Sequence, residues 1–231
     1  MVTMKLTQQW VVMNHKKVYR FMKKYDLLAK IRKRNPYKQI QHTTQEHSTT
    51  KNILSRHFRW ITPLTKLGTD ISYVKLQQKW CYLSIVKDMI TWEILSHSLS
   101  KTLNMWATLT SISHLEVKYG SRLEWVLLHS DQWWHYTHPS YATRLKQLKI
   151  VQSMSRKWNC LDNAVTESFF WHFKDEIEIE QIQSFEELEK YIDNYIFEYN
   201  NKHPPWNKKK MTPVQYRIHL LKIQTNTNNE S

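Results

Sequence analysis

From about residue 60 onward, three short β-rich runs are followed by an alternation of helices and strands, and this order constrains the fold most. The β-rich runs are Thr69–Val74, Trp80–Asp88 and Glu93–Leu99, with turn-like breaks between them. Beyond them, helical patterns cover 102–119, 139–148, 162–177 and 185–200, and strand patterns cover 124–130 and 150–153. This order predicts an α/β fold, in which helices flank a mixed five-stranded sheet.

Capping signals support two of these helix starts. Asp162 or Asn163 is placed to cap the helix that follows it. Ser184 opens the next helix, and Glu187 stands three residues later, which is the spacing of a capping box.

Charge is distributed unevenly along the chain, whose formal net charge is +14. Residues 1–60 carry a net charge of +12, residues 61–199 a net charge of −3, and residues 200–231 a net charge of +5. A strongly basic protein favours an anionic partner, most often nucleic acid, although a basic protein without such a partner has the same composition. Basic ends around a carboxylate-rich centre are expected of an enzyme that acts on a polyanion with metal ions.

The pattern divides the chain into three parts: a basic helical segment with a linker (1–56), a core with C-terminal helices (57–222) and a polar tail (223–231). In the first part, residues 10–34 are predicted to be helical, with Asn14 as the N-cap. Its candidates for DNA contact are Lys16, Lys17 and Arg20. The alternative is a solvated basic face on a small helical module.

Composition excludes several classes of protein. The chain is 41% hydrophobic and 13% aromatic, which excludes a mostly disordered protein. It has no run of 18 apolar residues and no secretory h-region, so we expect a cytoplasmic protein. Two cysteines, Cys81 and Cys160, are too few for a disulfide framework or a cysteine-based zinc site. We expect both to be buried small residues.

Three acidic residues hold positions that are costly for an unpaired charge. Asp70 lies in a strand, Asp131 follows an apolar strand, and Glu167 lies inside a helix. Each one alone is best explained as a hydrogen-bonded turn or capping acid. Together, they can bind two divalent ions about 4 Å apart, which clamp the attacking and leaving oxygens of a phosphate displacement. Lys174 lies two helical turns after Glu167 on the same face, where it can hold a phosphate.

The sequence around these acids resembles a known family. Asp131 and Glu167 have 35 residues between them, and the segments HSDQ, SMSRK, NCLDNA and ESFF occur around them in that order. TDISY and YLS match upstream, and MTPVQYR matches downstream. Over nearly its whole length, the chain resembles the second-frame transposase of the insertion-sequence family usually numbered three. That family belongs to the DDE integrase superfamily and is related to retroviral integrases.

The resemblance implies a ribonuclease-H-like fold and a DNA transposase of the bacterial cytoplasm, associated with the nucleoid. It implies cleavage with water as nucleophile and joining with a DNA 3′-hydroxyl as nucleophile, with Asp70, Asp131 and Glu167 as catalytic ligands of two Mg²⁺ or Mn²⁺ ions. The implied DNA backbone contacts come from Arg156, Lys157 and Lys174, and a solvated loop is the alternative for the first two. The implied partners are DNA, a first-frame helix-turn-helix protein and further copies of the chain. The family segment is longer at its start, so we expect the first part to be truncated.

The chain departs from the family in its tryptophans. It has 2 glycines and 11 tryptophans, whereas average usage of about 7% predicts roughly 16 glycines. Tryptophan occupies family glycine positions at Trp133, Trp158, Trp10 and Trp92, with Trp125 and Trp171 as further candidates. We interpret these positions as UGA codons that the host reads as glycine. The alternative is a decayed element whose protein carries the tryptophans.

The sequence is therefore compatible with three functions: a transposase, a catalytically inactive DNA-binding remnant of a transposase, and a nuclease of the same fold without joining activity. The intact acids and Lys174 favour the transposase. Tryptophans next to Asp131 and before the Glu167 helix favour the remnant, because they would crowd the DNA path or force a strained turn.

Overall fold

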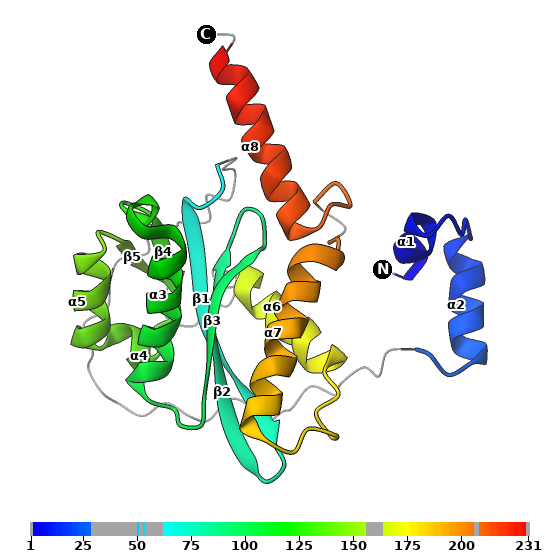
Figure 1. The fold of residues 1–231 in the computed structure, drawn as a ribbon, viewed down its shortest axis with the longest axis horizontal. Helices are drawn as coiled ribbons and strands as arrows, with labels where there is room; N and C mark the ends of the chain where they lie inside the picture. Colours follow the sequence, from blue (N-terminus) through cyan, green and yellow to red (C-terminus); the bar gives the residue numbers. More distant parts are fainter. Residues whose placement is uncertain are drawn as a thin grey trace.

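The computed structural model describes residues 2–28, 50, 53, 62–155, 164–205 and 208–229 (Figure 1). Its centre is a five-stranded sheet with the strand order β3-β2-β1-β4-β5. The strands are β1 (Lys66–Leu76), β2 (Lys79–Asp88), β3 (Ile94–Ser100), β4 (Leu127–Ser130) and β5 (Val151–Met154). β2 pairs antiparallel with β1 and β3, whereas β4 pairs parallel with β1 and β5. The predicted mixed sheet is confirmed.

Helices cover both faces of this sheet (Figure 1). On one face lie α3 (Met105–Tyr119) and α5 (Pro139–Gln147), and on the other lie α6 (Ala164–Glu176) and α7 (Phe185–Lys202). A 3₁₀ turn, η1 (Gly120–Leu123), and a short helix, α4 (Trp134–Thr137), flank β4 in the sequence. The chain also forms α1 (Val2–Gln8), α2 (His15–Lys24) and the C-terminal α8 (Pro213–Asn229).

Each face of the sheet has its own apolar core, because side chains alternate along the central strands. Leu67 and Ile71 of β1 point into the core beneath α3 and α5. Val74 of β1 and Ile85 of β2 point into the other core, where they join Phe169 of α6. By this alternation, the even-numbered residues of β1 face α6 and α7.

Two helix starts follow the predicted capping. Ser184 Oγ accepts a hydrogen bond from the Glu187 N–H at 3.1 Å, and the Glu187 carboxylate accepts one from the Ser184 N–H at 3.3 Å. Asn14 caps α2 by accepting the Lys16 N–H at 2.9 Å. The predicted cap at residues 162 and 163 lies outside the described residues.

Two segments differ from the prediction. Of the residues predicted to be helical, 10–34, α2 covers only 15–24: residues 10–14 precede its Asn14 cap or form it, 25–28 are not helical, and 29–34 lie outside the described residues. α8 continues to Asn229, through most of the predicted polar tail at 223–231, because no proline or glycine interrupts the chain there. Cys81 is buried as expected, whereas Cys160 lies outside the described residues. Of the helices described, none has the length and apolarity that crossing a membrane requires.

Candidate active site

Asp70 lies within β1, and Asp131 directly follows β4, the parallel strand beside it. β1 and β4 pair with Gly68 opposite His129. Two residues beyond this pair, Asp70 lies inside β1 and Asp131 lies directly after β4. Because paired strands lie about 4.7–4.9 Å apart, this register brings the two half-buried carboxylates side by side at the carboxyl end of β4.

The turn after β4 is held by hydrogen bonds that orient Asp131. Its Oδ1 accepts the N–H of Trp133 at 3.0 Å. The neighbouring Gln132 donates from Nε2 to the carbonyl oxygen of Ser155 at 2.9 Å, which ties the turn to the end of β5. The Asp131 carboxylate is therefore fixed relative to the sheet instead of turning freely in a loop.

Glu167 approaches these two acids from the first turn of α6, and its charge acts on both of them. The even-numbered face of β1 carries both Asp70 and Gly68 toward this helix. A side chain at residue 68 would overlap the hydroxyl of Thr166, the residue before Glu167. Glycine at this position allows α6 to lie directly on the strand that carries Asp70.

The three carboxylates influence one another electrostatically. Burial raises the pKa of Asp70 well above its ordinary value, and the charges of Asp131 and Glu167 raise it further. The Ile71 N–H and the Lys174 charge act in the opposite direction on this pKa. Burial likewise raises the pKa of Asp131 to about 6, and the Glu167 charge contributes. Divalent cations would relieve this repulsion between carboxylates.

The donor chemistry of the acids fits a hard divalent cation such as Mg²⁺, which prefers oxygen ligands. Within the described part of the chain, no three His, Cys, Asp or Glu side chains converge on one point. A Mg²⁺ ion, however, is usually bound through one or two carboxylates, with waters and substrate phosphates as its other ligands. The assignment of these carboxylates as metal ligands stays a prediction.

The basic residues predicted to contact DNA lie in three separate parts of the chain. The charge of Lys174 lowers the pKa of Asp70, and the role of Lys174 in holding a DNA phosphate stays a prediction. Three basic side chains are exposed on α2, and their role in DNA contact stays a prediction; they are Lys16, Lys17 and Arg20. Arg156 and Lys157 lie outside the described residues.

Sequence reasoning missed one residue of this region, Lys87 of β2. Its side chain is 0% exposed, and its Nζ donates a hydrogen bond to the Val165 carbonyl oxygen in α6 at 2.8 Å. The alternation of side chains along β2 could have indicated its burial, because Leu83, Ile85 and Lys87 lie on the same face of the strand.

Trp133, beside Asp131, adopts an ordinary extended backbone with φ −63 and ψ 148. Its ring packs against the core beneath α3 and α5 and lies edge-to-face with Tyr73, with ring centroids 6.1 Å apart. The prediction of a strained turn at this position is therefore wrong, because the Trp133 backbone is in an allowed region and its ring packs against Tyr73. Trp158 lies outside the described residues.

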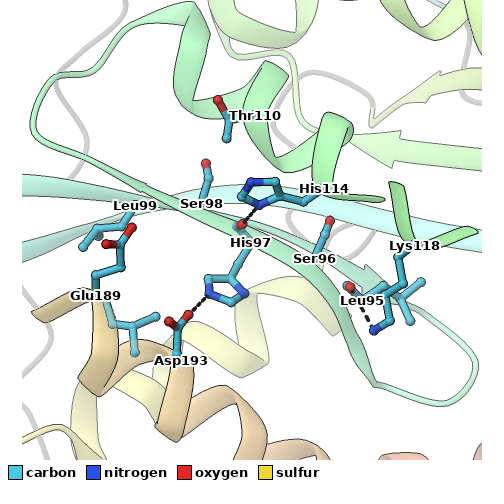
Figure 2. Close-up of a pocket in the computed structure, with 11 residues that line it drawn as sticks. Leu95, Ser96, His97, Ser98, Leu99, Thr110, His114, Lys118, Glu189 and Asp193 are labelled. Carbon is cyan, nitrogen blue, oxygen red and sulfur yellow. Dashed lines mark hydrogen bonds and ion pairs between the residues drawn. The ribbon is translucent and has the colours of Figure 1, made fainter. Parts of the chain in front are cut away.

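A separate pocket lies at the β3 edge of the sheet, between α3 and α7 (Figure 2). In it, His97 Nε2 lies 2.7 Å from Asp193 Oδ1, and Lys118 Nζ donates to the Leu95 carbonyl oxygen at 3.3 Å. The described residues that line it include none of the candidate catalytic acids.

Comparison with known proteins decides the family. Residues 62–160 and residues 167–221 both match the integrase core domain. An uncharacterized transposase-like protein of Haemophilus influenzae is 36% identical over 95% of this chain and 100% of its own length. The putative transposase InsK of insertion sequence IS150 from Escherichia coli is 35% identical over 94% of this chain and 75% of its own. The chain belongs to the IS3 family of DDE transposases. The predicted family and DNA transposition are thus confirmed, and nothing favours the inactive remnant over the transposase.

Solved structures confirm the ribonuclease-H-like fold of the transposase. The catalytic core domain of HTLV-2 integrase, in complex with magnesium, superposes with a TM-score of 0.53 at 14% identity, over 68% of this chain and 97% of that one. A simian T-cell lymphotropic virus intasome in complex with PP2A regulatory subunit B56 gamma gives 0.56 at 14% identity, over 93% and 74%. At this identity, the likeness concerns the fold alone.

Proposed function

We propose that the transposase cuts the ends of its insertion sequence and joins their 3′-hydroxyls to target DNA, with Asp70, Asp131 and Glu167 as its catalytic ligands of two divalent ions. The observation that carries the proposal is the parallel register of β1 and β4, which sets Asp70 beside Asp131, with Glu167 in the first turn of the helix that packs on Gly68. Two Mg²⁺ or Mn²⁺ ions would supply charge stabilisation for in-line displacement at phosphorus.

The protein side chains divide the remaining tasks. Asp70 and Asp131 would hold the ions from the sheet, and Glu167 would hold them from the helix. Lys174, whose charge acts on Asp70, would bind a DNA phosphate beside them and so orient the phosphodiester for attack. Both cleavage by water and joining by a 3′-hydroxyl are displacements of the same kind, so one set of ligands serves both.

Further DNA contacts and partners are part of the same proposal. The net charge of +14 favours backbone contacts, which would come from Arg156, Lys157, Lys16, Lys17 and Arg20. Two element ends must be brought together, so the transposase would act as a homo-oligomer on DNA, and the intasome among the similar structures supports this. A first-frame helix-turn-helix protein of the same element would recognise the terminal repeats, as the family resemblance implies.

A joining assay tests the proposal. A labelled DNA that runs through an element end into flanking sequence is incubated with supercoiled plasmid, the transposase and Mg²⁺ or Mn²⁺, and cut and joined products are separated on a gel. We expect both products from the native protein and neither from Asp131→Asn, which keeps its affinity for DNA. Asp193→Asn, in the distant β3 pocket, is the matched control and should stay within about twofold. Binding without cutting would instead indicate an inactive remnant, and cutting without joining would indicate a nuclease.

A further inference from the structure

We propose that Lys87 is a positioning residue, which holds the first turn of α6 against the sheet and thereby sets where Glu167 stands relative to Asp70. This inference rests on the proposed function only in the role it gives to those two acids. Lys87 itself lies on β2 and contacts neither DNA nor ions in the proposal.

The contact of Lys87 is unusual for a lysine. Its side chain is completely buried, whereas lysine is almost never fully buried unless it is paired. Its Nζ donates to the carbonyl oxygen of Val165 at 2.8 Å. Val165 is the second residue of α6 and stands two residues before Glu167. Burial and the charge of Lys208 lower the pKa of Lys87 to about 7, and the amine can donate this hydrogen bond in either protonation state.

Aromatic rings from both helices enclose the amine. Lys87 Nζ lies 5.9 Å from the ring centroid of Phe169 in α6 and 5.6 Å from that of Tyr199 in α7. These rings exclude water from the hydrogen bond and attract the ammonium form. The amine is therefore held where β2, α6 and α7 meet, and it has no contact with solvent.

The pairing of β1 and β2 connects this junction to the acids. Lys87 stands directly opposite Gly68, over which Thr166 of α6 packs closely. Asp70 stands two residues further along the same face of β1. Val165 and Thr166 are thus both docked on the sheet, by the amine and by the glycine, immediately before Glu167. Loss of the amine contact would release the turn from which Glu167 extends toward Asp70.

The test compares Lys87→Met with Lys118→Met. Lys118, an exposed lysine of α3, is the control, because its Nζ also donates to a backbone carbonyl, that of Leu95, in the pocket that none of the acids lines (Figure 2). Methionine keeps the length and apolar stem of lysine but removes the donor. We expect Lys87→Met to fold with an undiminished melting temperature, to bind Mn²⁺ at least tenfold more weakly by calorimetry, and to join DNA ends at least tenfold more slowly. Its DNA affinity should change less than twofold, and Lys118→Met should match the native protein throughout.

Two further measurements keep the outcome decisive. Lys87→Arg retains a donor and should recover Mn²⁺ binding to within about threefold; this variant also carries the test if Lys87→Met does not fold. Amide hydrogen exchange at Thr166 and Glu167 should speed up at least tenfold in Lys87→Met without DNA or metal. Native exchange and native Mn²⁺ affinity in Lys87→Met would overturn the proposal. If the native protein neither binds Mn²⁺ nor joins DNA, the proposed function fails, while the exchange rates still decide whether Lys87 holds the turn.

A second, independent observation concerns the backbone of three tryptophans, and from it we infer that the natural protein has glycine at residues 10, 92 and 125. Trp10, Trp92 and Trp125 have φ of 64, 69 and 66. This left-handed region is unfavourable for a bulky side chain and open to glycine without cost. They are three of the eight tryptophans within the described residues.

Trp10 occupies the position after a helix at which glycine is most common. Its N–H donates to the Thr7 carbonyl at 3.1 Å, and the Val11 N–H donates to the Leu6 carbonyl at 2.9 Å. These two bonds form a Schellman motif, whose left-handed residue is usually glycine. The Trp10 side chain is 94% exposed, so no packing of the ring offsets its backbone conformation.

Trp92 and Trp125 stand in two other tight connections. The Trp92 N–H donates to the Asp88 carbonyl at 2.8 Å in the turn between β2 and β3. The Trp125 N–H donates to the Lys149 carbonyl at 2.8 Å just before β4, and its side chain is 75% exposed. These connections require the left-handed conformation and make no use of the indole of Trp125. Lys87 Nζ also lies 5.4 Å from the ring centroid of Trp92, so glycine at residue 92 would remove one ring beside the amine but leave its hydrogen bond to Val165 in place.

The gene and the natural protein test this inference. We expect UGA codons at positions 10, 92 and 125, and glycine at these positions in mass spectra of the natively expressed protein. Trp125→Gly should raise the melting temperature of the recombinant chain, whereas Trp106→Gly, inside α3, should lower it. Tryptophan at all three positions in the native protein, or UGG codons there, would overturn the inference.

Discussion

Asp70 of β1 and Asp131 after β4 lie level on adjacent parallel strands, and the charge of Asp131 raises the pKa of Asp70. Two half-buried carboxylates at one level repel each other unless a cation lies between them. The fold thus keeps at the carboxyl end of β4 an arrangement that costs stability in the absence of metal. A site that is unfavourable for the isolated protein but suited to a ligand is typical of functional sites.

Replacing Asp70 with asparagine should stabilise the metal-free protein. The substitution removes a half-buried charge that Asp131 and Glu167 repel. In EDTA at pH 7.5, we expect Asp70→Asn to increase the free energy of unfolding by about 1 kcal/mol and to abolish DNA joining. Thermal unfolding measures the first effect, with Asp193→Asn as a control that gains nothing. A lower melting temperature for Asp70→Asn would show that the charges do not destabilise the fold.

Divalent metal should release protons when it binds. The pKa of Asp131 is raised to about 6, so near pH 6 about half of these carboxyls carry a proton in the metal-free protein. Metal binding requires the ionised form and therefore expels the proton. Calorimetric titration with Mn²⁺ in buffers of different ionisation enthalpy should show more release at pH 6 than at pH 8. Equal release at both values would contradict the raised pKa, and Asp131→Asn is the control.

Acid should destabilise the protein through His135. This side chain is 0% exposed, and burial, with a contribution from His138, lowers its pKa to about 4. An unfolded histidine has a pKa of about 6.5. Between these values, only the unfolded state takes up the proton, so stability falls as the pH decreases from about 6.5 to about 4.

Urea unfolding at pH 7.5 and pH 5 measures this effect. We expect His135→Gln to remove about 2 kcal/mol of the loss between the two pH values. His15→Gln, on the exposed face of α2, should leave the loss unchanged. The carboxyls with raised pKa act in the opposite direction, so only the difference between variants is diagnostic. The same loss in His135→Gln as in the native protein would contradict the assignment.

A side chain at residue 68 should disturb the site, and removal of the opposing hydroxyl should repair it. A methyl group at Gly68 overlaps the Thr166 hydroxyl, and overpacking of this kind costs about 1–3 kcal/mol. We expect Gly68→Ala to lower both stability and joining. The double variant Gly68→Ala/Thr166→Ala should recover most of both, as a double-mutant cycle would show. Additive losses would mean that the two residues do not meet.

The sequence alone allowed prediction of the features that depend on local chemistry. The capping box of Ser184 and Glu187 and the cap at Asn14 were predictable, since a helix start is decided within a few residues. The strands were predictable from their apolar runs and turn-like breaks, and the order of strands and helices predicted the mixed sheet. The three acids were predicted as site residues from their spacing and from the short sequence segments around them that resemble the family.

Only the tertiary structure decided how these parts meet. The level of Asp70 with Asp131 depends on the register of β1 against β4, and the burial of Lys87 depends on a helix that follows much later in the chain. The left-handed backbone at Trp125 is likewise set by its bond to Lys149. Such contacts join residues far apart in sequence, so local propensity carries no information about them. The residue types of the site could thus be read from local sequence, whereas their positions relative to one another depend on tertiary packing.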